Sequence, residues 1–297
     1  PVGPIVPMNR ILPPALAALV AAALAAFLPR HGAAQAGNPR SATVQKVYPS
    51  AVRVQIAAAG EVVRSASGIA FAREDGRTYV LTNAHVVDPS RAWAAPIELH
   101  VLASGARAPL AARVLARGRV PDVDLAVLEV QDASIPVTPV ASDDRLDLGE
   151  DLVVIGAPFG KGLSVAAGIV SQVEYEPAEN ARAPRVPTSL KTDAAIGYGS
   201  SGGGVFDVPA GRLVGLVEGY RTARVAFGKE EAYAFDVPMP GETFVAPAAK
   251  IRRFLEEHGL GRLAPGGGAA RAATAGSAGS AGSAAPAAAV VPAASRR

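Results

Sequence analysis

The stretch TDAAIGYGSSGGG (residues 192–204) concentrates glycines around two adjacent serines, Ser200 and Ser201. Glycine adopts backbone conformations that other residues avoid, so such a loop can direct two N–H groups into one small space. Two converging N–H donors stabilise a developing oxyanion, and a serine in the same loop can attack a carbonyl carbon. By composition alone the stretch would be a flexible turn, so its interpretation depends on the sequence around it.

A histidine stands at the end of a predicted strand upstream, in VLTNAHVV (residues 80–87). The end of a strand is rigid, and a general base needs a fixed angle to its nucleophile. A lone histidine is more often structural, but the other three histidines have poorer settings. His31 lies in the N-terminal leader, His100 within a predicted strand and His258 at a predicted helix end. His85 is therefore the candidate base.

An aspartate enters an otherwise apolar strand in DVDLAVL (residues 122–128). A carboxylate at the mouth of a buried strand needs a hydrogen-bonding or charged partner. Holding a histidine tautomer and stabilising its protonated form is one such role, and capping the strand as a surface acid is the alternative. Asp122 competes for the role, but Asp124 directly abuts the apolar run.

Short β-strands separated by turn signals are predicted for most of the remaining sequence. Val52, Val54 and Ile56 alternate with polar or small residues, and Asp75-Gly76 marks a hairpin between two apolar runs. The other predicted strands are Gly68–Ala72, Thr78–Thr82, Ile97–Leu102, Ala111–Leu115, Leu125–Val130, Leu152–Ile155, Val165–Val173, Ser189–Thr192, Gly204–Asp207, Leu213–Glu218 and Ala232–Val237. This pattern, interrupted by a polar linker at 131–149, predicts two β-barrels of Greek-key type. One helix is predicted, at Ala248–His258.

Composition excludes several classes of function. The 297 residues include no cysteine, so disulfides, thiolate metal sites and a cysteine nucleophile are ruled out. The net charge is only +3 and the cations are scattered, which argues against nucleic acid as a partner. No His-Glu-x-x-His motif or other metal-ligand cluster is present. Gly160-Lys161 lacks the spacing of a phosphate-binding loop. Together these absences mean that neither a metal nor another cofactor is expected.

The two ends of the chain are predicted to lie outside the folded part. Met8-Asn9-Arg10, the apolar run Ala15–Leu28 and the small residues Ala34-Gln35-Ala36 form the pattern of a secretory signal peptide cleaved after Ala36. The apolar run is shorter than the roughly 20 residues of a membrane-spanning helix. An uncleaved leader that anchors the protein is the alternative, and no other membrane insertion is expected. Residues 265–297 are rich in Ala, Gly, Ser and Pro, which predicts a disordered tail.

Four motifs together resemble the HtrA/Deg branch of trypsin-like serine proteases. They are TNAHVV (82–87), DLAVL (124–128), IGAPFG (155–160) followed by SVAAGIVS (164–171), and TDAAI…GSSGG (192–203). The resemblance covers about residues 47–255 and implies an all-β fold of two six-stranded Greek-key barrels with a short C-terminal helix. The expected protease domain is 37–264, with barrel one at about 47–130, barrel two at about 150–245 and the helix at about 248–258.

The resemblance also implies a role for each candidate residue. Ser201 resembles the nucleophile, His85 the base that takes its proton, and Asp124 the carboxylate that orients His85. The backbone N–H groups of Gly199 and Ser201 resemble the oxyanion hole. The residues expected near the specificity pocket are Ala195, Ile196, Tyr198 and Glu218. No acid stands where trypsin keeps one, so cleavage is expected after small or medium aliphatic residues rather than after Lys or Arg.

Two features depart from the pattern of this branch. Ser200 replaces the usual Asn before the nucleophile. Because this residue is not Asp either, activation by a new N-terminus, as in trypsin-type zymogens, is not expected. Only the predicted helix and the disordered tail follow where relatives of this branch usually carry a PDZ domain, so peptide sensing by such a domain is not expected. Relatives in this branch are often trimers, which leaves a homotrimer open.

The function expected from the sequence is that of a periplasmic or secreted serine endopeptidase acting on protein or peptide substrates. Its role would be quality control or processing of envelope proteins through an acyl-enzyme intermediate. Two alternatives stay open: a non-catalytic or latent binding module, chaperone-like, on a protease fold, and an esterase using the same residues. An α/β-hydrolase would instead need a Ser–Asp–His order.

Overall fold

The first six strands close on themselves around a core of apolar side chains. The structure is a computed structural model that describes residues 37–88, 96–177, 185–227 and 233–264, without the side chains of 227–236 and 238. Barrel one is a closed antiparallel sheet with the strand order β1-β2-β3-β6-β5-β4. Its strands are β1 (Ala51–Ala58), β2 (Glu61–Glu74), β3 (Arg77–Thr82), β4 (Ile97–Ala103), β5 (Leu110–Arg117) and β6 (Ala126–Val130).

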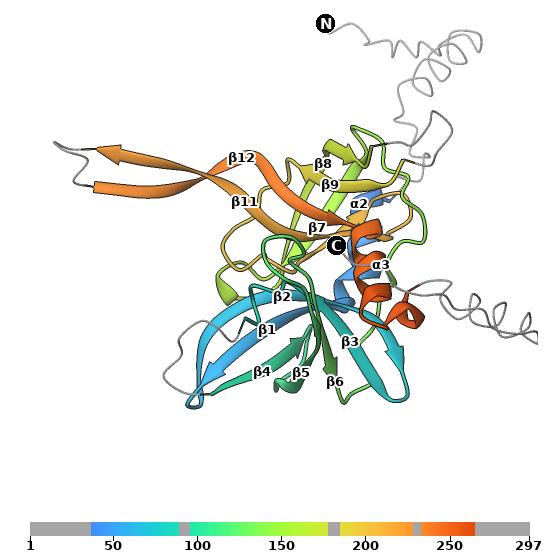
Figure 1. Cartoon of the computed structure of the whole chain (residues 1–297), viewed down its shortest axis with the longest axis vertical. Helices are drawn as coiled ribbons and strands as arrows, with labels where there is room; N and C mark the ends of the chain where they lie inside the picture. Colours follow the sequence, from blue (N-terminus) through green and yellow to red (C-terminus); the bar gives the residue numbers. More distant parts are fainter. Residues whose placement is uncertain (1–36, 89–95, 178–184, 228–232, 265–297) are drawn as a thin grey trace, which may run out of the picture. The chain divides into compact units, whose positions relative to one another are not determined.

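The next six strands form a second closed barrel, which lies above barrel one in Figure 1. Its strand order is β10-β11-β12-β9-β8-β7. Read from β7 backwards, this is the order of barrel one with six added to each strand number. Its strands are β7 (Asp151–Gly156), β8 (Ser164–Tyr175), β9 (Pro187–Thr192), β10 (Gly204–Asp207), β11 (Leu213–Phe227) and β12 (Tyr233–Pro247). The predicted fold class, two six-stranded barrels, is therefore confirmed.

Strands β2, β3 and β6 are buried on both faces where the barrels meet. Val80 and Leu128 point into barrel one, whereas Tyr79, Leu81 and Val127 on the same strands belong to a core continuous with barrel two. Successive side chains of a strand point to opposite faces, so one strand can serve both cores. This sharing of strands between two cores fixes the strand ends at the junction of the barrels.

Two short helices pack on barrel two. The helix α3 (Ala248–Glu257) buries Ile251, Phe254 and Leu255 in the shared core, as the sequence predicts. The helix α2 (Pro39–Val47) is not predicted, because its apolar residues do not follow a helical period. Tertiary contacts hold α2 instead: Thr43 Oγ1 donates to the Val208 carbonyl oxygen at 2.7 Å. Three single-turn 3₁₀ segments complete the helical elements among the described residues: η1 (Tyr48–Ser50), η2 (Pro158–Gly160) and η4 (Gly261–Leu263).

The last two strands are much longer than predicted. The predicted strand Leu213–Glu218 is part of β11, and the predicted strand Ala232–Val237 is part of β12 except for Ala232, which lies outside the described residues. Both strands also extend away from the barrel as a two-stranded ribbon (Figure 1). Pairs from Thr222↔Pro238 to Phe227↔Tyr233 form the ribbon. The prediction missed the section of β12 that closes the barrel against β9, at Thr243–Val245. Pro238, Pro240 and Gly241 interrupt the strand pattern there, and the register between β11 and β12 shifts at this place, between the pairs Tyr220↔Thr243 and Thr222↔Pro238.

The predicted leader, including its cleavage point after Ala36, and the tail 265–297 lie outside the described residues. The linker at 131–149 is described, and it contains no strand apart from a single bridge between Val140 and Leu213. Among the helices that the structure describes, none combines the length and the apolar character needed to span a membrane.

Candidate active site

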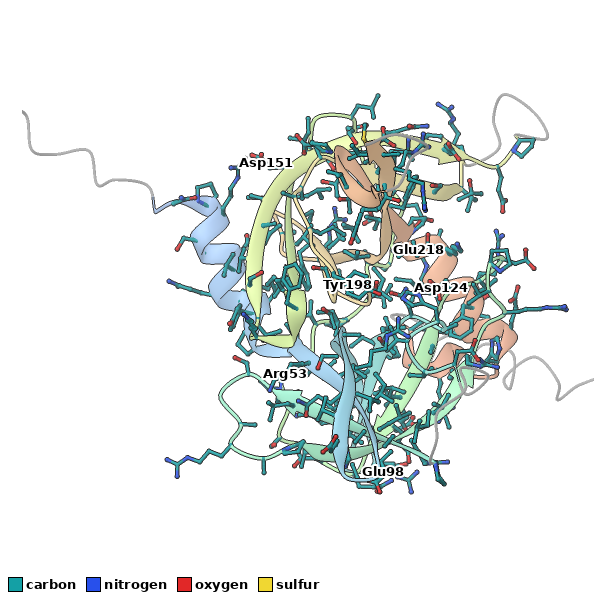
Figure 2. The ribbon with its side chains drawn as sticks, turned by 90° about the vertical axis from the view of Figure 1, so that its left-hand side faces the viewer. Arg53, Glu98, Asp124, Asp151, Tyr198 and Glu218 are labelled. Atoms are coloured by element: carbon teal, nitrogen blue, oxygen red, sulfur yellow. The ribbon has the colours of Figure 1, made fainter. Side chains whose placement is uncertain are left out.

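His85 and Asp124 meet because β3 and β6 are neighbours in barrel one. The two strands pair antiparallel, with Thr82 opposite Ala126. His85 lies three residues beyond Thr82, and Asp124 lies two residues before Ala126, so both are at the same end of the pair. The expected partners, far apart in sequence, are therefore brought together by the register of two strands. Asp124 lies at the level where the barrels meet (Figure 2).

The Asp124 carboxylate holds His85 through two contacts. Its Oδ1 accepts the backbone N–H of His85 at 2.8 Å, and its Oδ2 lies 2.6 Å from His85 Nδ1. A carboxylate can only accept here, so Nδ1 carries the proton and Nε2 is left as the basic nitrogen. Asn83 Nδ2 donates to the Asp124 carbonyl oxygen at 2.8 Å and fixes the turn. The competing Asp122 is exposed and makes neither contact with His85.

The loop around Ser201 is held by three successive carbonyl groups. The Tyr198 carbonyl oxygen accepts from the Phe159 N–H at 2.6 Å. The Gly199 carbonyl oxygen accepts from the Ser67 hydroxyl at 2.7 Å. The Ser200 carbonyl oxygen accepts from the Gly203 N–H at 2.9 Å. Three consecutive peptide planes thus have fixed orientations.

The fixed carbonyls determine where the amide hydrogens point. In a planar trans peptide the C=O and N–H groups point in opposite directions. The Gly199 N–H therefore points away from Phe159, and the Ser201 N–H points away from Gly203. Neither N–H has a backbone acceptor among the described residues, whereas the intervening Ser200 N–H donates to the Gly197 carbonyl oxygen at 3.0 Å. The N–H groups of Gly199 and Ser201 are thus both available to donate to a single acceptor outside the loop.

Two glycines make this loop conformation accessible. Gly199 has φ +93° and Gly202 has φ +82°, in the region that L-residues rarely adopt. A Cβ atom at Gly202 would lie 2.2 Å from the Ser67 carbonyl oxygen, so the backbone could not keep its path. Ser200, which replaces the usual Asn, is buried and its Oγ accepts from the Gly197 N–H at 3.3 Å. Its side chain therefore supports the loop rather than facing the cleft.

Ser201 and His85 line the same cleft between the barrels, with a volume of about 290 Å³. Barrel one contributes Arg64, Ser65, Ala66, His85 and Val86; barrel two contributes Tyr198, Gly199, Ser201, Gly219, Tyr220 and Thr222. Burial raises the pKa of the Tyr220 hydroxyl, and the neighbouring Tyr198 adds to the rise, so Tyr220 stays neutral at working pH. Among the residues that the structure describes, no Asp or Glu lines the cleft.

The four residues expected near the specificity pocket do not all reach the cleft. Tyr198 lines it and is 68% exposed. Ala195 and Ile196 line a separate recess of about 40 Å³ on the Ser200 side of the loop. The Glu218 carboxylate accepts from Lys250 Nζ at 2.8 Å and does not line the cleft. Its charge is therefore balanced by Lys250.

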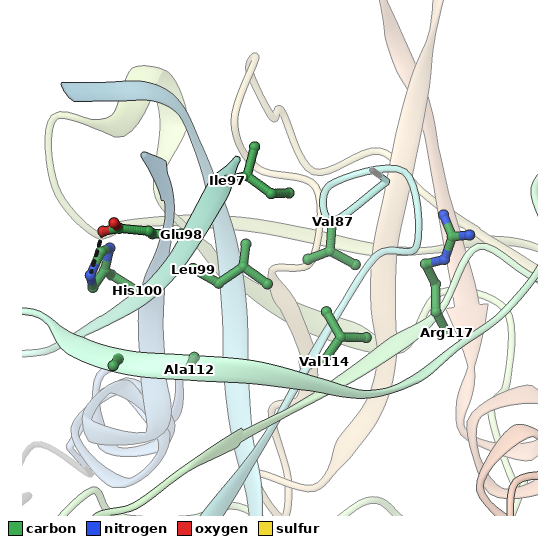
Figure 3. Close-up of a pocket in the computed structure, with 9 residues that line it drawn as sticks. Val87, Ile97, Glu98, Leu99, His100, Ala112, Val114 and Arg117 are labelled. Atoms are coloured by element: carbon green, nitrogen blue, oxygen red, sulfur yellow. Dashed lines mark ion pairs between the residues drawn. The ribbon is translucent and has the colours of Figure 1, made fainter. Parts of the chain in front are cut away.

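A larger hollow, of about 510 Å³, lies beside β4 and β5, where Leu99 and Ala112 also pack against the core of barrel one. Val87, Ile97, Leu99 and Val114 line it, and a Glu98–His100 pair flanks it (Figure 3). It brings together no serine, base and carboxylate, so the chemistry points to the smaller cleft between the barrels. No group of three His, Asp or Glu side chains among the described residues is arranged to hold a metal ion.

Sequence analysis missed the residues that support the nucleophile loop from outside. Ser67 lies in β2 and Phe159 in the turn after β7, and both hydrogen-bond to the loop. Phe159 also has φ +56°, which is unusual for a residue other than glycine. The one available signal was a polar residue, Ser67, beside the apolar run of a strand. Nothing in the local sequence shows that its partner lies in the other barrel.

Two β-barrels with a histidine–carboxylate pair and a serine in one cleft define the class of trypsin-like peptidases. The comparison with protein families agrees, because the trypsin-like peptidase domain matches residues 66–216, about half of the chain. The chain therefore belongs to the trypsin-like peptidase family.

Within this family, the chain has relatives of the HtrA/DegP type. It is 32% identical over 224 residues to the human serine protease HTRA4, covering 73% of this chain and 41% of that protein. It is 36% identical over 155 residues to a probable periplasmic serine endoprotease, DegP-like, of Marinomonas sp., covering 52% of this chain and 29% of the relative. The chain thus spans less than half the length of these curated relatives.

Solved structures support the same fold. The crystal structure of a serine endoprotease from Yersinia pestis matches with a TM-score of 0.55 and 23% identity, over 75% of this chain and 68% of that one. An inactive form of a mutant protein from M. tuberculosis matches with a TM-score of 0.53 and 24% identity, over 73% of this chain and 90% of that one.

Gly202→Ala should abolish peptide hydrolysis, because its Cβ collides with the Ser67 carbonyl oxygen and displaces the loop. Gly60→Ala is the matched control: Gly60 has φ +80°, but nothing lies within 4 Å of its added Cβ. Both variants carry backbone strain of about 1 kcal/mol. Hydrolysis rates and thermal unfolding of both variants test this, and comparable activity in the two would contradict it.

Proposed function

We propose that the protein is a serine endopeptidase in which Ser201, His85 and Asp124 cleave peptide bonds through an acyl-enzyme. The observation that carries the proposal is the 2.6 Å contact of His85 Nδ1 with Asp124, made in a cleft that Ser201 also lines. The contact leaves His85 Nε2 free to take a proton, which is the state a general base needs.

The first half of the reaction forms the acyl-enzyme. Ser201 Oγ attacks the substrate carbonyl carbon while His85 Nε2 takes the hydroxyl proton. The carbonyl oxygen becomes an oxyanion, which accepts from the N–H groups of Gly199 and Ser201. His85, protonated and stabilised by Asp124, then gives its proton to the leaving amine as the C–N bond breaks. The Ser201 ester of the N-terminal fragment remains.

The second half releases that fragment. A water molecule takes the place of the amine, and His85 Nε2 accepts its proton as the water oxygen attacks the ester carbon. The second oxyanion accepts hydrogen bonds from the same two N–H groups. Collapse returns the proton to Ser201 Oγ and frees the carboxylic acid. Each donor is oriented before the substrate arrives, so no reorganisation energy is spent on it during the reaction.

The edge of β11 supports a polypeptide as the substrate rather than a small ester. β10 covers one edge of β11 only from Leu213 to Leu216. The next residue, Val217, is bonded through its backbone to Gly202 and Gly203. Beyond Val217 this edge has no strand partner among the described residues, and Gly219, Tyr220 and Thr222 line the cleft. An extended chain entering the cleft can therefore pair its backbone with β11. Processing or quality control of unfolded envelope proteins fits this mode of binding.

The mature protein should react with a fluorophosphonate probe, and Ser201→Ala should not. Asp124→Asn should react about 10⁴ times more slowly, because the imidazole loses the partner that sets its tautomer. Asp122→Asn is the matched control and should react like the parent. The readout is the rate of covalent labelling at neutral pH. Absence of labelling in the parent would favour the latent binding module.

Peptides with Ala, Val or Leu before the scissile bond should be cleaved at least about tenfold faster than peptides with Lys or Arg. No carboxylate lines the cleft among the described residues, so a substrate cation would be desolvated there without a partner. The measurement is kcat/KM across a panel of peptides that differ only at this position. A preference for Arg would contradict the proposed specificity.

We also propose export to the periplasm or the extracellular space, with cleavage of the leader after Ala36. The pattern of residues 8–36 supports this. Cleavage there would leave intact the helix α2, which starts at Pro39 and docks on barrel two. Mass spectrometry of the exported protein should give an N-terminus at Gly37. Retention of the apolar run in the membrane fraction would favour the anchored alternative. The homotrimer stays a prediction.

A further inference from the structure

Ser67 connects barrel one to both segments that shape the nucleophile loop. It lies in β2, and its solvent exposure is 0%. Its Oγ accepts from the Ala157 N–H at 2.7 Å and donates to the Gly199 carbonyl oxygen at 2.7 Å. Its backbone N–H donates to the Ser201 carbonyl oxygen at 2.9 Å. Its backbone oxygen accepts from Thr82 Oγ1 at 2.8 Å.

The two hydrogen bonds of the hydroxyl have directions that cannot be exchanged. A carbonyl oxygen only accepts, and a backbone N–H only donates. The Ser67 proton must therefore lie toward Gly199, while a lone pair faces Ala157. Rotation of the hydroxyl would break at least one bond in a site without water access, and an unpaired buried polar group is costly.

The same hydroxyl acts on two neighbouring peptide planes. It fixes the Gly199–Ser200 plane directly, through the Gly199 carbonyl. It fixes the Tyr198–Gly199 plane indirectly, because Ala157 begins the turn from which the Phe159 N–H binds the Tyr198 carbonyl at 2.6 Å. The second plane carries the Gly199 N–H. Gly199 itself resists rotation little, because glycine has few steric barriers.

The turn at Ala157–Gly160 needs to be held from barrel one. Phe159 has φ +56° and its side chain is 71% exposed, so its own packing does not stabilise this conformation. Two hydrogen bonds join this turn to described residues of barrel one: the Ser67 hydroxyl accepts from the Ala157 N–H, and Arg53 Nη1 donates to the Gly160 carbonyl oxygen at 2.5 Å. Arg53 reaches only the far end of the turn, whereas Ser67 reaches both the turn and the loop.

We propose that Ser67 is the positioning residue of the oxyanion hole: its hydroxyl keeps the Gly199 N–H directed at the developing oxyanion. This inference rests on the proposed peptidase function. It makes the barrel-one strand β2 a part of the machinery that stabilises the transition state, although Ser67 touches neither the substrate nor the reacting atoms.

Ser67→Ala should lower kcat by about 10²-fold with little change in KM, because an oxyanion donor acts mainly in the transition state. A peptide aldehyde, which forms an oxyanion with the enzyme, should bind more weakly by a similar factor. The matching peptide alcohol should bind unchanged. Thr82→Val is the matched control: it removes an equally buried hydroxyl that bonds to Ser67 but not to the loop. Its kcat should fall much less.

A pair of isosteric variants separates the hydroxyl from packing. Ser67→Thr and Ser67→Val add the same bulk at the same buried position and differ only in the hydroxyl. The kcat of the Thr variant should exceed that of the Val variant by at least about tenfold. This is less than the roughly 10²–10³-fold loss of kcat when one oxyanion donor is removed. Equal kcat in this pair, or an unchanged kcat in Ser67→Ala, would overturn the proposal.

Hydrogen exchange distinguishes failure of this inference from failure of the proposed function. In a Ser201→Ala background, Ser67→Ala should accelerate amide exchange across residues 195–203, and Thr82→Val should not. If Ser67→Ala accelerates exchange but the unmodified protein does not hydrolyse peptides, Ser67 supports the loop and the proposed peptidase function is rejected. If Ser67→Ala leaves exchange unchanged and the unmodified protein hydrolyses peptides, the role of Ser67 is rejected and the peptidase function is retained.

Discussion

The pairing of β3 with β6 is the constraint on which the rest of the site depends. It puts Thr82 opposite Ala126, so that His85 and Asp124 leave the same end of one strand pair and meet at 2.6 Å. A slip of one residue would turn every side chain of β3 to the opposite face. The register is therefore protected by burial, because Val80 and Leu81 pack into two different cores.

The second half of the site depends on hydrogen bonds rather than on packing. The loop at 197–203 has one large side chain, Tyr198, which is 68% exposed, and the shape of the loop is set by the hydrogen bonds that its carbonyl groups accept. Those donors come from the loop itself, from the turn after β7 and from β2. The available N–H groups of Gly199 and Ser201 are thus a consequence of how their neighbours are bonded.

Both barrels have the same strand order, although no repeat is evident between the two halves of the sequence. Their arrangement gives the cleft two unlike walls, with β2 and the His85 turn on one side and β11 with the nucleophile loop on the other. Because β11 continues into the ribbon, the wall that can pair with a polypeptide is longer than the cleft itself.

The sequence by itself determined the two-barrel fold, most strand positions, and the identity of His85, Asp124 and Ser201 as the candidates brought to one site. These features can be predicted because strand periodicity and glycine-rich turns are local properties of the chain. The helix α2, the barrel-closing section of β12, the pairing of Glu218 with Lys250 and the role of Ser67 were decided only by the tertiary structure. Each depends on partners from distant segments, and no local pattern encodes which distant group a side chain will meet.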